Sequence, residues 1–194
     1  MQQVDNDIWL TGADMVVSPH FDERPQTGAG GEISLLVIHN ISLPPASCED
    51  DFDNEVVEAF FIGALDCQRY PSLVELAGVR VSSHLYIKRC GKVIQFVPLN
   101  KRAWHAGVSC FAGRERCNDF SIGIELQGTD TLPYSDAQYE SLISVTLQIR
   151  RLYPAIGLDN IVGHCDIAPD RKTDPGSAFD WIYYRKLLAA KINE

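Results

Sequence analysis

The sequence contains no long uninterrupted hydrophobic run and no pair of cysteines two residues apart. Its apolar stretches are all shorter than the roughly 18–20 residues that a membrane helix requires, so no membrane contact is expected. The beginning, MQQVDNDIWLTGADMVV, has no basic start followed by an apolar stretch, and we expect no secretory signal. The six cysteines form no CxxC pair, which excludes the compact zinc and redox motifs. We therefore expect reduced thiols and a cytoplasmic location.

Basic residues are scarce relative to acidic ones. The chain has 17 Lys and Arg against 26 Asp and Glu, for a formal net charge of −9 at pH 7. Binding to nucleic-acid phosphates needs a basic surface, so no nucleic-acid partner is expected. Local basic groups such as NKRAW and GRERC still allow a positive cleft for a small anionic substrate. No feature indicates an obligate protein partner.

The length and pattern predict one α/β domain over residues 1–194, with a central mixed sheet flanked by helices. The chain is 45% hydrophobic and has no internal repeat or linker long enough to divide it. Before residue 33, the segment SPHFDERPQTGAGGE is expected to be a surface loop. The predicted strands cover 34–40, two stretches of 83–98 around a turn at 90–92, and 121–126, and the predicted helices cover 55–66, 135–153 and 179–192.

Three groups that can do chemistry stand at or near predicted strand ends. His39 follows LLVI, Glu125 follows IGI, and His164 follows IVG. Strand ends at one edge of a sheet can bring such groups together on a rigid support. The loop GHCDIAPDRKTDPG after the last of these strands adds a possible third metal ligand, because Asp166, Asp170 and Asp174 are all chemically suitable.

Two imidazoles and one carboxylate would give Zn²⁺ three protein ligands and an open position for water, whose pKa can fall to about 7. Glu125 is then the candidate for moving the proton of that water to a leaving amine, and Lys172 for stabilising an oxyanion. Each residue also has a structural interpretation: a hydrogen-bonded histidine, a salt-bridged glutamate, a solvated lysine.

Four longer stretches resemble a known family. They are VIHNISLPP, VSSHLYIKRCGKVIQFVPLNKRAWHAGVS, GRERCNDFSIGIELQGTDTLPYSDAQY and GHCDIAPDRKTDPGSAFDW. Over about residues 7–187 the chain resembles the zinc-dependent N-acetylmuramoyl-L-alanine amidases, which are related to peptidoglycan recognition proteins. Among these it is most similar to the cytoplasmic 1,6-anhydro-N-acetylmuramyl-L-alanine amidases of bacterial cell-wall recycling.

The resemblance implies a role for ten residues of this chain. It implies that the Zn²⁺ ligands are His39, His164 and Asp174, that Glu125 is the catalytic acid/base, and that Lys172 stabilises the transition state. It also implies substrate contacts from Arg80 and Arg116, whose planar guanidinium groups suit carboxylates. The remaining substrate-binding positions expected from family-like motifs are Asn40, Trp104 and His105.

The implied reaction is hydrolysis of the amide between the lactyl group of 1,6-anhydro-N-acetylmuramic acid and the L-alanine of a stem peptide. The implied partner is therefore an anhydromuramyl-peptide substrate, and the implied process is peptidoglycan recycling, with an indirect part in β-lactamase induction. The alternative from another class is a non-catalytic muropeptide-binding module. Its mark would be the loss of a metal ligand, and all three are present. A metalloprotein of other chemistry, such as a peptidase, is a third alternative.

The chain departs from the family pattern mainly in the segment ASCEDDFDNEVVEAFFIGALDCQ, which matches poorly at its start. The GAGGE region is also individual to this chain. Cys165 adjoins a proposed ligand, but we interpret it as a packing thiol.

Overall fold

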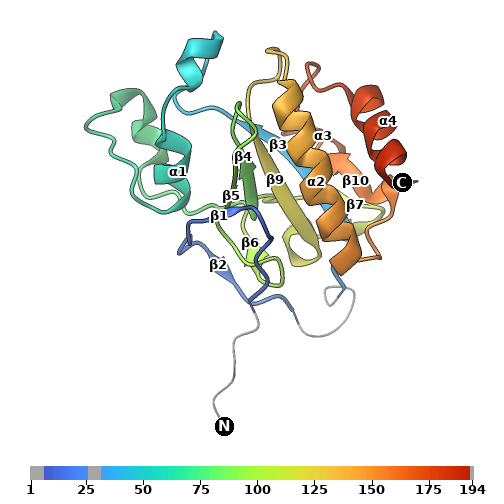
Figure 1. The fold of residues 1–194 in the computed structure, drawn as a ribbon. Helices are drawn as coiled ribbons and strands as arrows, with labels where there is room; N and C mark the ends of the chain where they lie inside the picture. Colours follow the sequence, from blue (N-terminus) through green and yellow to red (C-terminus); the bar gives the residue numbers. More distant parts are fainter. Residues whose placement is uncertain (1–6, 26–31, 193–194) are drawn as a thin grey trace.

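The computed structural model describes residues 7–25 and 32–192 and places a six-stranded mixed sheet at the centre of the molecule (Figure 1). Its order is β1-β5-β4-β9-β3-β10, with β5 antiparallel to β4 and the other neighbouring pairs parallel. The predicted mixed sheet with flanking helices is confirmed. These six strands are β1 (Asp14–Met15), β3 (Leu35–Ile41), β4 (Leu85–Ile87), β5 (Val93–Gln95), β9 (Ser121–Gln127) and β10 (Ile161–Gly163).

Two small two-stranded sheets and several helices surround the central sheet. The small sheets pair β2 (Phe21–Asp22) with β6 (Arg102–Ala103) and β7 (Cys110–Phe111) with β8 (Arg114–Glu115). The α-helices are α1 (Val56–Phe61), α2 (Asp136–Leu152), α3 (His164–Ile167) and α4 (Trp181–Ile192). The 3-10 helices are η2 (Glu49–Phe52), η3 (Pro71–Leu76), η4 (Cys117–Asp119) and η5 (Leu158–Asn160). Within the described residues, no helix is both long and apolar enough to cross a bilayer.

Successive side chains along β3 and β9 point to opposite faces of the sheet. Leu36 and Ile38 of β3 and Ile122 and Ile124 of β9 belong to the core cluster that also contains buried residues of α2 and α4. Leu35 and Val37 point the other way, into a separate cluster. Because successive side chains of a strand alternate between faces, the next residue in that second series, His39, lies on the face opposite α2 and α4.

Helix α2 begins at the capping box that the sequence predicts. The Ser135 Oγ accepts a hydrogen bond from the Gln138 backbone N–H at 3.1 Å, and the Gln138 Oε1 accepts one from the Ser135 N–H at 3.2 Å. The Gln138 Nε2 also donates to the carbonyls of Ile87 and Gln127, which belong to β4 and β9. The cap therefore also attaches the helix to the sheet.

Two local predictions were wrong. The helix predicted over 55–66 ends at Phe61, because Gly63 adopts a left-handed conformation with φ of +73°, as glycine does after helix ends. The predicted surface loop over residues 18–32 contributes to the interior in its first part, because Ser18, His20 and Arg24 are buried. Each of these polar side chains makes hydrogen bonds to backbone carbonyl groups, which composition alone does not show. Residues 26–31, which include most of the GAGGE region, lie outside the described residues.

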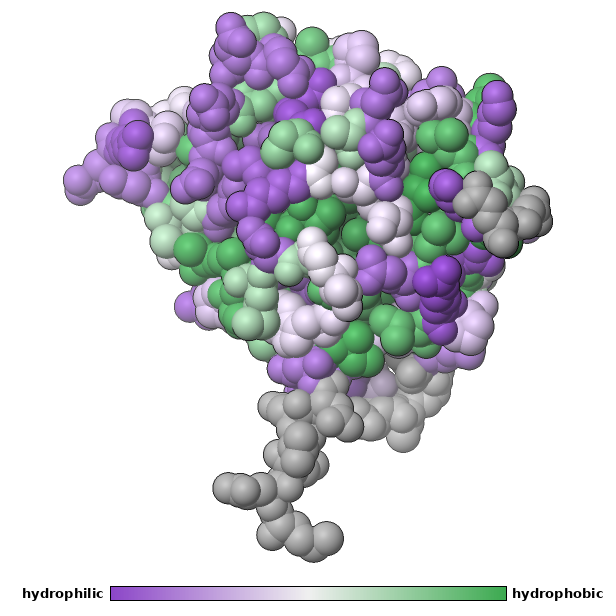
Figure 2. All heavy atoms as spheres, in the orientation of Figure 1, coloured by the Kyte–Doolittle hydropathy of each residue, from purple (hydrophilic) through white to green (hydrophobic). Residues whose placement is uncertain are grey.

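The hydrophilic side chains in Figure 2 gather at the upper left, over the segment that holds η2 and α1. Glu49, Asp50, Asp51 and Asp53 of this segment are exposed. Arg89 connects the segment to the rest of the molecule, since its Nη2 lies 2.7 Å from the Glu49 Oε2 and its Nη1 donates to the Gln138 Oε1.

The helix α2 supplies a matched test of the core. Leu142 is fully buried beneath the helix, whereas Leu152 at its end is 48% exposed. We expect Leu142→Ala to lower the free energy of unfolding by about 2–5 kcal/mol, because it leaves a cavity, and Leu152→Ala to change it by about 0.5 kcal/mol or less. Urea unfolding of both variants measures the difference, and equal effects would contradict this assignment of the core.

Candidate active site

Three neighbouring parallel strands bring the chemistry-bearing side chains together. In the register of β3 and β9, His39 lies directly opposite Glu125. In the register of β10 and β3, Gly163 lies opposite Ile38, so the next residue, His164, lies beside His39. Residues paired in this way point to the same face of a sheet. The convergence of His39, Glu125 and His164 predicted from the sequence is therefore confirmed, although β3 and β9 each continue two residues beyond their member of the group.

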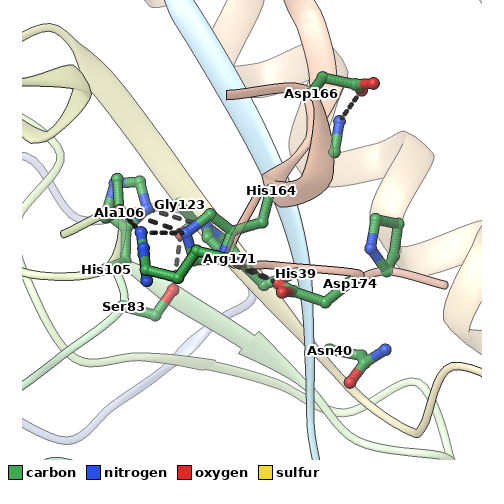
Figure 3. Close-up of polar contacts among 12 residues, drawn as sticks. His39, Asn40, Ser83, His105, Ala106, Gly123, His164, Asp166, Arg171 and Asp174 are labelled. Carbon is green, nitrogen blue, oxygen red and sulfur yellow. Dashed lines mark hydrogen bonds and ion pairs between the residues drawn. The ribbon is translucent and has the colours of Figure 1, made fainter. Parts of the chain in front are cut away.

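The segment after β10 folds back and carries a carboxylate to the same place (Figure 3). One helical turn, α3, begins at His164, and the Asp166 Oδ2 accepts a hydrogen bond from the Gly163 N–H at 2.7 Å. The Cys165 N–H donates to the Asp174 carbonyl at 3.0 Å, which closes the loop. Asp174 thereby joins the histidines, whereas Asp166 serves as a helix cap and Asp170 lines another groove.

The three side chains form a compact group of metal-binding atoms. The Nδ1 atoms of His39 and His164 are 3.0 Å apart, and the Asp174 Oδ2 lies 3.0 Å from the first and 3.1 Å from the second. All three residues are buried. In a tetrahedral zinc site with bonds of about 2.0–2.1 Å, ligand atoms are roughly 3.3 Å apart, so the spacing suits such an ion.

The hydrogen bonding of His164 also fits a cation. Its Nε2 lies 3.2 Å from the Ala106 carbonyl oxygen, which can only accept, so a hydrogen on Nε2 completes this contact. In that tautomer the Nδ1 has a lone pair that faces the Asp174 carboxylate. A cation between these two acceptors makes the contact favourable: a proton in the metal-free protein, which then forms the hydrogen bond to Asp174, or a metal ion.

Burial and neighbouring charges shift the pKa values of this group. Desolvation lowers the pKa of His39 to about 4, which favours the neutral imidazole that a metal needs. Burial alone raises the pKa of Asp174, but its hydrogen bonds to His164 and His39 outweigh burial and hold the pKa well below its usual range. Burial, reinforced by the charge of Asp174, raises the pKa of Glu125 well above its ordinary value.

A cavity of about 220 Å³ opens beside the three atoms. Glu125 and Lys172 both line it, and the Glu125 Oε2 is buried without a hydrogen-bond partner among the described protein groups. Lys172 is close enough to oppose the rise in the Glu125 pKa. A carboxylate and an ammonium thus face the same small space as the metal-binding atoms.

Asn40, Trp104 and His105 also line this cavity. The Asn40 Nδ2 donates to the Asp130 Oδ1 at 2.8 Å, and the Trp104 Nε1 donates to the Asp22 Oδ1 at 3.1 Å. His105 differs from the other two, because its Nδ1 lies 2.9 Å from the His39 Nε2 (Figure 3).

The structure does not bring Arg80 and Arg116 into the cavity. Arg80 is exposed and makes no hydrogen bond or ion pair to the part of the chain that the structure describes. The Arg116 side chain is 71% exposed, and its Nε lies 3.1 Å from the Asp119 Oδ2. Arg116 lines a separate groove of about 550 Å³. Only an extended ligand could reach these side chains and the cavity together.

The sequence reasoning assigned no role to the residues that support the site. Arg171 donates to the carbonyls of Ala106 and Val108 at 2.7 and 2.9 Å, and Asn118 accepts from two backbone N–H groups beside the histidines. Both lie inside the family-like motifs, and that position is the only signal that singled them out.

Comparison of the sequence with known proteins identifies relatives of this chain. The sequence profile of the N-acetylmuramoyl-L-alanine amidase family matches residues 29–177. The 1,6-anhydro-N-acetylmuramyl-L-alanine amidase AmpD of Escherichia coli K12 is 55% identical over 181 residues, which are 93% of this chain and 94% of that protein.

Solved structures agree with this relationship. A crystal structure of a selenomethionine AmpD derivative has a TM-score of 0.86 and 53% identity, covering 93% of this chain and 96% of that one. The E. coli amidase AmiD, in complex with its substrate anhydro-N-acetylmuramic acid-L-Ala-D-γ-Glu-L-Lys, has a TM-score of 0.59 and 29% identity, covering 86% of this chain and 65% of that one.

Close packing behind His105 supplies a test of this geometry. A Cβ on Gly123 would lie 2.5 Å from the His105 ring, whereas one on Gly157 would meet nothing within 4 Å. We expect Gly123→Ala to lower the free energy of unfolding by about 1–3 kcal/mol through overpacking, and Gly157→Ala to leave it nearly unchanged. Thermal unfolding of the pair checks this, and a Gly123→Ala variant as stable as the wild type would contradict it.

Proposed function

The chain belongs to the N-acetylmuramoyl-L-alanine amidase family, and on that premise we propose that it hydrolyses the amide joining the lactyl group of 1,6-anhydro-N-acetylmuramic acid to the L-alanine of a stem peptide. The single observation that carries the proposal is the set of three metal-binding atoms beside a cavity that Glu125 and Lys172 both line. The relatives act on the same chemistry: AmpD is named for the anhydro sugar, and AmiD is seen with such a substrate.

In this proposal His39, His164 and Asp174 hold one Zn²⁺. The two neutral imidazoles and the carboxylate are a ligand set that zinc enzymes use, with a fourth position left open. When bound, the ion lowers the pKa of a water molecule and polarises the amide carbonyl.

Glu125 is proposed to move the proton. Burial raises the pKa of this carboxyl group, which makes its ionised form a stronger base for a proton of the attacking water. Once protonated, the same group can deliver that proton to the nitrogen of L-alanine. An amine leaves readily only when its nitrogen is protonated, so this transfer is needed for the C–N bond to break.

Lys172 is proposed to stabilise the transition state. Lys172 lines the same cavity as Glu125 and Asp174, where its ammonium group can neutralise negative charge that develops on the amide oxygen. Asn40, Trp104 and His105 line the same cavity, and we propose that Asn40 and Trp104 contact the substrate there.

Arg80 and Arg116 are proposed to meet the carboxylates of the stem peptide outside the cavity. Both are exposed, which leaves their guanidinium groups available to a ligand that extends from the metal site. We keep a cytoplasmic location and a single amidase domain over residues 1–194 as parts of the same proposal.

Metal removal tests the proposed function. We expect a chelator to reduce release of peptide from an anhydromuramyl-peptide to background, and added Zn²⁺ to restore it, because the ion supplies the nucleophile. Mass spectrometry of the incubation measures the products. Full activity in metal-free protein would end the zinc proposal, and an intact ligand with the zinc-loaded protein would favour the non-catalytic muropeptide-binding module instead.

The variant Glu125→Gln separates activity from stability. We expect kcat to fall by about 10²–10⁴-fold, the usual contribution of general acid–base catalysis, while zinc stays bound. The folded pKa of Glu125 lies above its unfolded value of about 4.3, so its contribution to stability is full below that value and is lost as the pH rises through the folded pKa.

The glutamine variant of metal-free protein should therefore be more stable than the wild type at neutral pH, by about 1 kcal/mol or more, or roughly 2–4 °C in Tm. The difference should narrow toward pH 4. Thermal unfolding across this range in the presence of a chelator measures it. A wild-type kcat in the variant would show that Glu125 does not transfer the proton. Equal dependence of Tm on pH in the two proteins would show that burying the charged Glu125 does not destabilise the fold.

A further inference from the structure

The two proposed histidine ligands share one support on their far side. Each turns its Nδ1 to the metal-binding group and its Nε2 to the same short segment: the His39 Nε2 lies 2.9 Å from the His105 Nδ1, and the His164 Nε2 lies 3.2 Å from the Ala106 carbonyl oxygen. Two consecutive residues thus contact ligands that are 125 positions apart in the chain.

These contacts fit histidines that present the lone pair of Nδ1 to a metal ion. If His39 binds through Nδ1, its Nε2 carries the hydrogen and donates it to the His105 Nδ1. His105 then carries its own hydrogen on Nε2, where the Ser121 Oγ at 3.1 Å accepts it. His164 donates from Nε2 to the Ala106 carbonyl in the same sense. With a metal bound, these hydrogen bonds would hold both imidazoles in the tautomer that it requires.

The side-chain carboxamide of Asn118 holds the backbone of His105 and Ala106 in place. The Asn118 Oδ1 accepts hydrogen bonds from the backbone N–H groups of His105, at 3.1 Å, and Ala106, at 2.8 Å. Asn118 belongs to the short helix η4 and is itself only partly exposed. It contacts neither the three ligand atoms nor the cavity, so any effect on the metal must pass through the segment it holds.

A buried guanidinium anchors Asn118 in turn. Arg24 is 7% exposed, and its Nη1 donates to the carbonyls of Asn118 and Asp119, while its Nη2 donates to those of Leu99 and Ser121. From the other side, Arg171 donates to the Ala106 carbonyl, the same oxygen that receives the His164 hydrogen bond. The segment is held on both of its sides.

We propose that Asn118 is a positioning residue for the metal centre: by holding both backbone N–H groups, it sets the orientation of His39 and His164. The inference rests on the proposed function, since it takes these histidines as ligands. Partners of metal ligands commonly change metal affinity by about 10–100-fold when they are removed. Asn118 acts one step further out, but on both histidines at once.

The test compares zinc affinity in three variants of the full-length protein. Asn118→Ala removes the acceptor, and Asn118→Asp keeps an oxygen that can accept both N–H groups in nearly the same shape. Leu142→Ala destabilises the core far from the site and serves as the structural control. Competition with a chelating indicator gives the zinc dissociation constant of each, and the d–d absorption of bound Co²⁺ reports the ligand geometry.

We expect zinc to bind Asn118→Ala about 10-fold or more weakly than the wild type, with an altered Co²⁺ spectrum. Asn118→Asp should recover most of the affinity, and Leu142→Ala should keep wild-type affinity in spite of its lower stability. An unchanged affinity and spectrum in Asn118→Ala would overturn this inference alone, as would equal losses in the alanine and aspartate variants. Failure of the wild-type protein to bind zinc would overturn the metal site itself, and this inference with it.

Discussion

The site depends on the register between three parallel strands. Hydrogen bonding between β3 and β9 sets His39 beside Glu125, and pairing of β10 with β3 sets His164 beside His39. A shift of one residue in either pairing would turn one of these side chains to the helix-covered face of the sheet, because alternate residues point to opposite sides. The hydrophobic cluster under α2 and α4 opposes such a shift, since it would bury polar groups and expose apolar ones. The same packing that stabilises the fold therefore also aligns the site.

The sequence predicted the parts of this arrangement that local pattern controls. Apolar runs ending in polar groups predicted β3 and β9, and Ser135 with Gln138 predicted the start of α2. The residues alone left three aspartates open as the third ligand. The choice depends on how the loop after β10 closes through the hydrogen bond from the Cys165 N–H to the Asp174 carbonyl, and no spacing rule specifies that contact. Resemblance to the family supplied the choice, and the structure places Asp174 with the histidines.

Two kinds of residue were beyond prediction from the sequence. Buried polar groups are the first: Arg24 lies in a turn-rich segment that composition indicates as surface, yet four backbone carbonyls surround its guanidinium. Groups that reach the site only indirectly are the second. Asparagine is common in turns, so the residue type of Asn118 indicates no further role. Its proposed effect on the histidines depends on two backbone N–H groups that come near it only in the folded chain. Both are long-range consequences of topology.

The burial of Arg24 also bears on where the functional unit begins. All of the proposed ligands and catalytic groups lie in β3 or later, whereas the guanidinium that braces η4 comes from the segment before that strand. A shortened version of the chain starting just ahead of β3 would keep every proposed ligand, catalytic group and substrate contact. It would leave the carbonyls around Arg24 without their donor and the support behind both histidines without its anchor. The part of the chain needed to hold the site in shape thus begins earlier in the sequence than the part that carries its proposed ligands and catalytic groups.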